Sequence, residues 1–310
     1  MSYLPHQEDF LLSLKVNNYS QETIYNYERD LNVFLNFLQD SKLEFNKLNK
    51  KDILNYKALL TSIDRTTAKS QKTTKKLSPY SINRMLSVIR AYLKYLIDND
   101  YDTPLAPDTI KMLKTTKKKS QVPELEQLVK LIESPNIFEK NNKIATRNRA
   151  ILEVLFATGL RISELINIKI NQIDKEGKVF VLGKGKKERF VYLTPRALEH
   201  LQKYLKIRPE DSPYLFVPYR GLNAGVKHKK LSTNYLQERI KRYREYLDIN
   251  IPASAHSLRH GFATYLAESG ASPAAIQILL GHESLDTTTR YVHASDKYAQ
   301  KIHKKYHPLK

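Results

Sequence analysis

The chain has 310 residues, of which 41% are hydrophobic and none is cysteine. This composition supplies a core for one large or two ordinary domains and argues against wholesale disorder. The lack of cysteine excludes disulfides, thiolate nucleophiles and cysteine-ligated zinc, and it fits a reducing cytosol. No apolar run approaches the roughly 20 residues that span a bilayer, and the first ten residues lack the basic and apolar regions of a signal peptide.

The charge balance is strongly basic. Lysine and arginine number 52 against 32 acidic residues, a formal net charge of +20 at pH 7. Such an excess attracts polyanions and steers association. Nucleic acid is therefore the first class of partner, and an anionic membrane surface is the second. A lysine-rich protein without a specific anionic partner has the same composition, so charge alone does not decide between them.

The first third of the chain predicts helices. Residues 20–38 carry apolar side chains at helical spacing, with Ser20 as N-cap. A second helix begins where Ser78 can cap and Pro79 suits the first helical position. We predict a small all-helical domain over residues 1–105. The candidate DNA-binding side chains of the second helix lie off its apolar stripe: Arg84, Arg90 and Lys94.

Two basic segments interrupt this pattern. Residues 65–76 contain five basic residues and no acidic one. They predict a flexible loop, which would lie near phosphates in a DNA-binding protein and would otherwise be merely solvated. Two prolines at 104 and 107 and a dense lysine run after them predict an interdomain linker over residues 106–121. The lysines that could follow a DNA backbone there are Lys117, Lys118 and Lys119.

The second domain is predicted over residues 122–310. Its patterns indicate a helix, a glycine-containing turn and a helix over 146–168, and further helices over 231–247, 256–270, 272–282 and from about 295 to 306. Alternation on both sides of a Gly-Lys-Gly turn predicts a β-hairpin over 178–193. The fold class expected for the whole chain is mainly α with a small β-hairpin.

Side chains at turns and helix starts of this domain form a candidate catalytic set: Arg161, Lys184, His256, Arg259, His282 and Tyr291. His256 and Arg259 are three residues apart and share one helix face. Such a group of cations, with no carboxylate among its main members, suits a phosphodiester. Planar guanidinium groups bind two non-bridging oxygens at once and neutralise the charge of an in-line transition state.

An attacking oxygen is also needed, and Tyr291 can supply it. Free tyrosine has a pKa near ~10, and neighbouring guanidinium groups would favour the phenolate. Exchanging one phosphodiester for another needs no ATP, and cations supplied by the protein make a metal unnecessary. Taken singly, each residue has a structural interpretation as a solvated cation or a packed aromatic. His256 and His260 lack the glutamate of a zinc-binding His-Glu-x-x-His site.

The segments GLRISEL, GKGKKER, HSLRHGFAT and LLGHESLDTTTRYVH resemble, motif for motif, the tyrosine recombinase (λ-integrase-like) family and its Xer branch of site-specific recombinases. The resemblance covers essentially the whole chain. The S-x-x-T-x-x-x-Y-x-x-D-L pattern from Ser20 resembles the helical, SAM-like core-binding domain, and KIHKKYHPLK resembles the terminal segment of Xer proteins. The resemblance to this family implies a mixed α/β catalytic domain after the helical domain. The long basic loop at 65–76 and the final Pro-Leu-Lys depart from the family pattern.

The resemblance implies a role for each member of the set. Tyr291 would join a DNA 3′-phosphate and leave a 5′-hydroxyl. Arg161 and Arg259 would hold the scissile phosphate, and Lys184 would protonate the leaving 5′-oxygen. The site histidines would be His256 and His282. Glu164, one turn after Arg161, would support the site from behind.

The last helix carries an apolar stripe at Tyr298, Ile302 and Tyr306. It is buried against its own domain or, as the resemblance implies, exchanged between protomers.

The resemblance implies an enzyme without cofactors that acts as a homo- or hetero-tetramer on specific duplex DNA through a Holliday junction. It would resolve chromosome or plasmid dimers in the prokaryotic cytoplasm, at the nucleoid, as part of chromosome partition and cell division. A second Xer-type recombinase and a DNA translocase are further candidate partners. A mobile-element integrase, a type IB topoisomerase and a non-catalytic DNA-binding protein stay open as alternatives.

Overall fold

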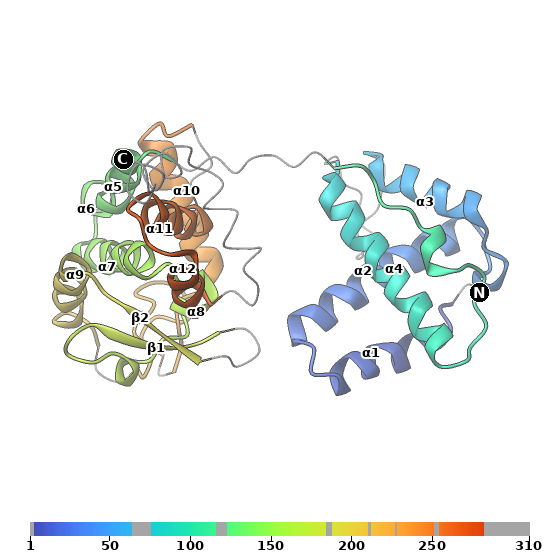
Figure 1. Cartoon of the computed structure of the whole chain (residues 1–310), viewed down its shortest axis with the longest axis horizontal. Helices are drawn as coiled ribbons and strands as arrows, with labels where there is room; N and C mark the ends of the chain where they lie inside the picture. The colour runs from blue at the N-terminus through green and yellow to red at the C-terminus, as the bar shows by residue number, and fades with distance from the viewer. Residues whose placement is uncertain are drawn as a thin grey trace, which may run out of the picture. The chain divides into compact units, whose positions relative to one another are not determined.

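A computed structural model of the chain describes residues 3–63, 76–115, 123–183, 188–209, 212–226, 228–250 and 254–281. The chain forms two compact units, residues 1–118 and 119–310, whose elements are labelled in Figure 1. Each unit has its own apolar core. Helices dominate both, and the strands in the described ranges form one two-stranded sheet. The expected fold class, mainly α with a small hairpin, is confirmed.

The N-terminal unit is built on two capped helices that the sequence predicts. The Thr23 amide donates to the Ser20 hydroxyl at 3.1 Å, and the Ser81 amide donates to the Ser78 hydroxyl at 3.2 Å. Pro79 stands at the first helical position. Two further helices, the first and third, were not predicted. The elements of the unit are α1 (Gln7–Val16), α2 (Gln21–Asp40), η1 (Phe45–Lys47), α3 (Lys50–Thr61), α4 (Pro79–Asp98) and η2 (Pro107–Thr109).

Helix α4 is the centre of this unit and packs against the other three helices. The predicted stripe of α4 is buried as a whole: Ile82, Leu86, Ile89, Leu93 and Leu96. The chain after α4 folds back onto it. Ile110 is fully buried, and the Asn83 side chain accepts from the Leu113 amide at 2.7 Å and donates to the Leu113 carbonyl at 3.0 Å.

The segment predicted as a linker, 106–121, therefore begins inside the N-terminal unit, which is a correction. The prolines at 104 and 107 indicate a connection, but Ile110 supplies an apolar side chain that the core buries. The lysines at 117–119 and residues 65–75 of the basic loop lie outside the described residues.

The C-terminal unit is arranged around α7. This helix contacts α5, α6, α9, α11 and strand β2, and 12 of its 17 residues are buried. The predicted helices over 146–168, 231–247, 256–270 and 272–282 are confirmed. The one expected over 295–306 lies outside the described residues. The helices of the unit are α5 (Leu125–Glu133), α6 (Pro135–Phe138), α7 (Asn142–Thr158), α8 (Ile162–Leu165), η3 (Ile170–Gln172), α9 (Pro195–Leu205), α10 (Thr233–Tyr246), α11 (Ala255–Glu268) and α12 (Pro273–Leu280).

The predicted hairpin is present. Strands β1 (Lys178–Leu182) and β2 (Glu188–Tyr192) pair antiparallel, with Leu182 opposite Glu188 at the end nearest the tip. The inner face buries valines and one charged residue, Arg189, which stands opposite Val181. Tip residues 184–187 lie outside the described ranges. None of the helices in the described ranges is long and apolar enough to cross a membrane.

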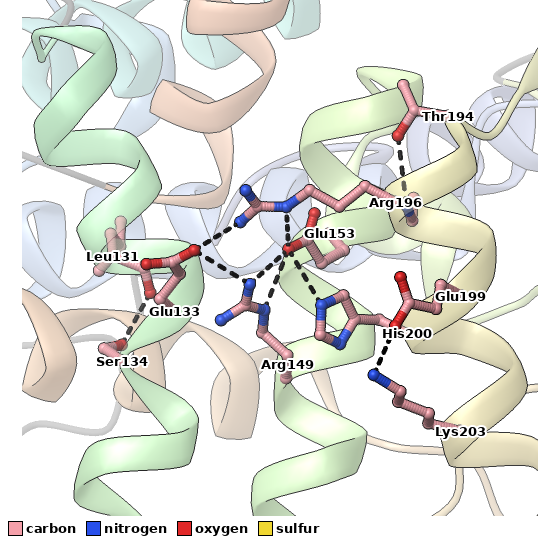
Figure 2. Close-up of polar contacts among 11 residues, drawn as sticks. Leu131, Glu133, Ser134, Arg149, Glu153, Thr194, Arg196, Glu199, His200 and Lys203 are labelled. Atoms are coloured by element: carbon pink, nitrogen blue, oxygen red, sulfur yellow. Dashed lines mark hydrogen bonds and ion pairs between the residues drawn. The ribbon is translucent and has the colours of Figure 1, made fainter.

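An ion-pair cluster fastens α5 and α9 to α7 (Figure 2). The buried Glu153 carboxylate accepts from Arg149 Nε at 3.0 Å and from Arg196 Nε at 2.8 Å. The same two arginines donate to Glu133 at 3.3 and 2.9 Å, which closes a ring of alternating charges. His200 lies 3.8 Å from Glu153. The ring holds α7 in place, and α7 leads directly into the candidate site.

Glu153→Ala is expected to lower the free energy of unfolding by about 3 kcal/mol. Breaking a buried ion pair leaves the remaining charge without its partner and costs about 3–5 kcal/mol. We expect the low end of this range because Glu133 still accepts a hydrogen bond from Arg149. Urea unfolding measures the change. The matched control is Glu199→Ala, which removes an exposed pair with Lys203 and is expected to leave the free energy of unfolding nearly unchanged. Equal losses for the two variants would contradict a structural role for the ring.

Candidate functional site

The turn between α7 and α8 positions Arg161. It depends on Gly159, whose φ of +62° favours glycine. A Cβ at Gly159 would lie 2.4 Å from Phe262 Cδ1 on α11 and 3.0 Å from Leu280 Cδ2 on α12. Glycine thus lets the turn lie against both helices. Arg161 follows at the start of α8 with its side chain 38% exposed.

Arg259 joins this turn to the end of α12. It projects from α11 and is only 3% exposed. Its Nη1 donates to the Gly159 carbonyl at 2.7 Å, and its Nη2 donates to the Leu280 carbonyl at 2.8 Å. The α12 helix ends there at Gly281, whose φ is +64°. The two motifs GLR and LLGH, far apart in the sequence, meet at this guanidinium group.

His256 completes the described part of the predicted set. It lies one turn before Arg259 on α11. Partial burial lowers the pKa of His256, and the positive charges of Arg259 and Arg161 lower it further. The structure therefore brings Arg161, His256 and Arg259 together, in a region of positive charge that favours the neutral imidazole.

Glu164 lies directly behind Arg161. It accepts from the Arg161 backbone amide at 2.8 Å and from Arg161 Nη1 at 3.0 Å. It also accepts two hydrogen bonds from Arg189, at 3.0 and 2.8 Å. Burial acts to raise the pKa of Glu164, but the hydrogen bonds from Arg189 and Arg161 and their charges outweigh it and hold the pKa below its usual value. Glu164 is thus a buried, ionised carboxylate.

Two residues of this region were not predicted as site residues. Arg189 is one, and His260 is the other. The Nε2 atoms of His260 and His256 lie 2.8 Å apart, so one ring donates and the other accepts. Burial, followed by the charges of His256 and Arg259, lowers the pKa of His260 to about 4. The sequence signal for this pair was two histidines at i and i+4 on one helix, a spacing that also occurs in metal sites.

The remaining predicted catalytic residues lie outside the described ranges: Lys184, His282 and Tyr291. The structure does show their nearest described neighbours. The pair Leu182–Glu188 carries the hairpin tip to which Lys184 belongs. Gly281, packed against Arg189, immediately precedes His282.

The candidate DNA-binding side chains of α4 differ in their surroundings. Arg84 Nη2 donates to the buried Asp30 carboxylate at 3.0 Å, and Arg84 Nη1 contacts the other oxygen. Arg90 pairs with the exposed Asp108 at 2.5 Å. Lys94 is exposed. Arg84 therefore has a structural contact in addition to any contact with a ligand.

Comparison with known proteins places this arrangement in a family. Residues 121–298 match the phage integrase family, and residues 8–100 match its N-terminal SAM-like domain. The chain is 34% identical to the tyrosine recombinase XerC of Leptospira interrogans, over 96% of this chain and 92% of that protein. It is 30% identical to the tyrosine recombinase XerD of Staphylococcus epidermidis, over 97% of this chain and 98% of that protein.

A solved structure has a similar fold. The XerH site-specific recombinase, in a post-cleavage complex with its palindromic difH substrate, matches with a TM-score of 0.72. The match covers 94% of this chain and 81% of that one at 22% identity, and it bears on the fold alone.

The lowered pKa of His260 makes stability depend on pH. Between about pH 4 and the unfolded value near ~6.5, the unfolded chain binds the proton and the folded chain does not. The free energy of unfolding should therefore fall as the pH is lowered through this window. His260→Gln should weaken that fall without abolishing it, because His256 and His200 act in the same direction.

Urea unfolding at several pH values between 4.5 and 7.5 measures the slope, with the exposed His6→Gln in the N-terminal unit as control. A His260→Gln slope equal to that of the wild type would contradict the prediction, as would a His260 ring that titrates near ~6.5 by NMR.

Proposed function

The chain belongs to the phage integrase family and is a Xer-type site-specific tyrosine recombinase, and we propose that Tyr291 is the nucleophile with which it cuts and rejoins duplex DNA. One observation carries the assignment of the site. Arg161, His256 and Arg259 converge beside Gly281, the residue from which the chain continues to His282 and Tyr291. The two arginines and the histidine thus lie near the point from which the chain continues towards the proposed nucleophile.

The proposed chemistry is a transesterification. The Tyr291 oxygen attacks the scissile phosphorus, a tyrosine–phosphorus bond forms on the DNA 3′-phosphate, and the bond to the 5′-oxygen breaks. Lys184 donates the proton that the leaving 5′-oxygen takes up, and a site histidine takes the phenol proton. Arg161 and Arg259 stabilise the charge that develops on the non-bridging oxygens. The reverse reaction with a 5′-hydroxyl needs neither ATP nor an added metal.

The proposed partner is duplex DNA that contains a specific recombination site. The net charge of +20 suits a polyanion, and the structurally similar XerH site-specific recombinase was solved bound to its palindromic difH substrate. We infer that four protomers act on two sites through a Holliday junction, either as one kind of chain or with a second Xer-type recombinase. A DNA translocase is the proposed activator. The cellular role that fits is chromosome or plasmid dimer resolution, carried out at the nucleoid in the cytoplasm.

Covalent trapping tests the nucleophile. Nicked duplexes carrying candidate sites or genomic fragments are incubated with the protein and a chelator, alone and with a homologous Xer-type recombinase, and then denatured. Wild type is expected to give a protein–DNA adduct, and Tyr291→Phe none. Tyr246→Phe is the matched control, because this exposed tyrosine of α10 belongs to no predicted site. An adduct that persists in Tyr291→Phe, or no adduct under either condition, overturns the proposal.

Substitutions of Lys94 and Arg84 should have different effects on DNA affinity and on the free energy of unfolding. Lys94→Ala removes an exposed cation. The negative slope of log K against log salt should therefore become less steep by about 1, with little change in the free energy of unfolding. Arg84→Ala should also lower the free energy of unfolding by about 1–3 kcal/mol, because the buried Asp30 loses its bidentate partner. Fluorescence anisotropy across a salt series and urea unfolding measure the two effects. An unchanged salt slope in Lys94→Ala would remove this residue from the interface.

A further inference from the structure

Two arginines share one buried carboxylate at the candidate site. Glu164 accepts four hydrogen bonds, two from Arg161 and two from Arg189. Each carboxylate oxygen accepts one bond from each arginine. Arg189 therefore binds the same carboxylate that orients Arg161. It comes from strand β2, 25 residues after Glu164 in the chain.

The two arginines differ in what else they can reach. The Arg189 side chain is 7% exposed and that of Arg161 is 38% exposed. The remaining side of Arg189 is also occupied, since its Nε donates to the Leu279 carbonyl at 3.0 Å. A Cβ on Gly281 would lie 3.0 Å from Arg189 Nη1, so the backbone closes over this guanidinium group. Arg189 is fixed as a structural cation, and Arg161 is the member of the pair that a phosphate can approach.

The charges show why a second arginine is needed. Glu164 orients Arg161 through its backbone amide and its Nη1, but a carboxylate 3.0 Å from a guanidinium group also cancels its charge. One carboxylate and one arginine sum to zero; with Arg189 the three groups sum to +1. We propose that Arg189 is a positioning residue that neutralises Glu164, so that Arg161 is held in place and keeps its positive charge for the scissile phosphate. This inference rests on the proposed function of Arg161.

Cleavage of a nicked duplex by three variants tests the charge balance. Arg189→Met should slow covalent cleavage about 10- to 100-fold, the usual range for loss of a residue that supports a site from behind. Arg189→Met combined with Glu164→Gln should be faster than Arg189→Met alone, because removing both charges restores the sum of +1. Arg189→Lys keeps the charge and should fall between wild type and Arg189→Met.

A second substrate separates charge from misfolding. When a neutral methylphosphonate replaces the scissile phosphate, less negative charge needs stabilising, so Arg189→Met should lose much less of the wild-type rate than it does on the phosphate. Arg149→Met is the matched control. It also removes one of two arginines from a buried carboxylate, here Glu153, which keeps Arg196 within the ring that joins α5, α7 and α9. It should lower the melting temperature and, at a temperature where every variant is folded, cleave both substrates at the wild-type rate.

A readout without DNA keeps this inference distinct from the proposed function. Inorganic sulfate is titrated into the protein while the ring signals of His256, which lies in the field of Arg161 and Arg259, are followed by NMR. Sulfate should bind more weakly to Arg189→Met than to wild type, and binding should recover in the double variant.

Equal sulfate affinity in wild type and Arg189→Met, or a double variant no better than the single one, overturns the role of Arg189. The absence of any Tyr291-dependent adduct in wild type overturns the proposed function instead, and the sulfate titration still decides the charge balance.

Discussion

The end of α12 is bound to the turn between α7 and α8 and to Glu164 by two buried guanidinium groups. Arg259 bridges the carbonyls of Gly159 and Leu280, and Arg189 bridges the carbonyl of Leu279 and the carboxylate of Glu164. The last carbonyls of a helix have no partner within the helix and carry partial negative charge. Arginine suits them because its donors point in fixed directions. A separate apolar cluster packs α11 against α12, and the directional bonds of the two arginines add a fixed geometry to that contact.

These bonds require backbone without side chains at two points. At Gly159, any larger residue would collide with Phe262 and would have to adopt an unfavourable positive φ. At Gly281 a side chain would press on Arg189 in the same way. The two glycines are thus two sides of one contact, although they are more than a hundred residues apart. Gly281 lets the Arg189 guanidinium group approach the main chain, and Gly159 lets the Phe262 ring do so.

The sequence predicted what depends on local pattern. The caps at Ser20 and Ser78, the buried stripe of α4 and the hairpin all follow from spacing within a few residues. Helix α3 was missed although its Asn49–Asp52 capping box is also a local signal. The docking of Ile110 could not be predicted, because the short apolar group Ile110, Met112 and Leu113, between a proline and a lysine run, is equally consistent with a linker.

Arg189 shows where prediction from the sequence reaches its limit. Alternation along β2 places it on the same inward face as Val191, so a charged residue at a core position was visible in the pattern. Its partner, Glu164, belongs to another element, and only the fold brings the two together. The same holds for Asp30 and Arg84, which are 54 residues apart. The sequence shows that a buried charge needs a partner, but it does not identify the partner.

The ratio of charges distinguishes the candidate site from a purely structural network. In the ring of Figure 2, two carboxylates face two arginines, Arg149 and Arg196, and the four charges sum to zero. At Glu164 a single carboxylate faces two arginines, and the sum is +1. A neutral ring stabilises the fold, but it has no net positive charge with which to attract an anion. An excess arginine, with its partner carboxylate neutralised from behind, is oriented and still charged, which is what binding a phosphate requires.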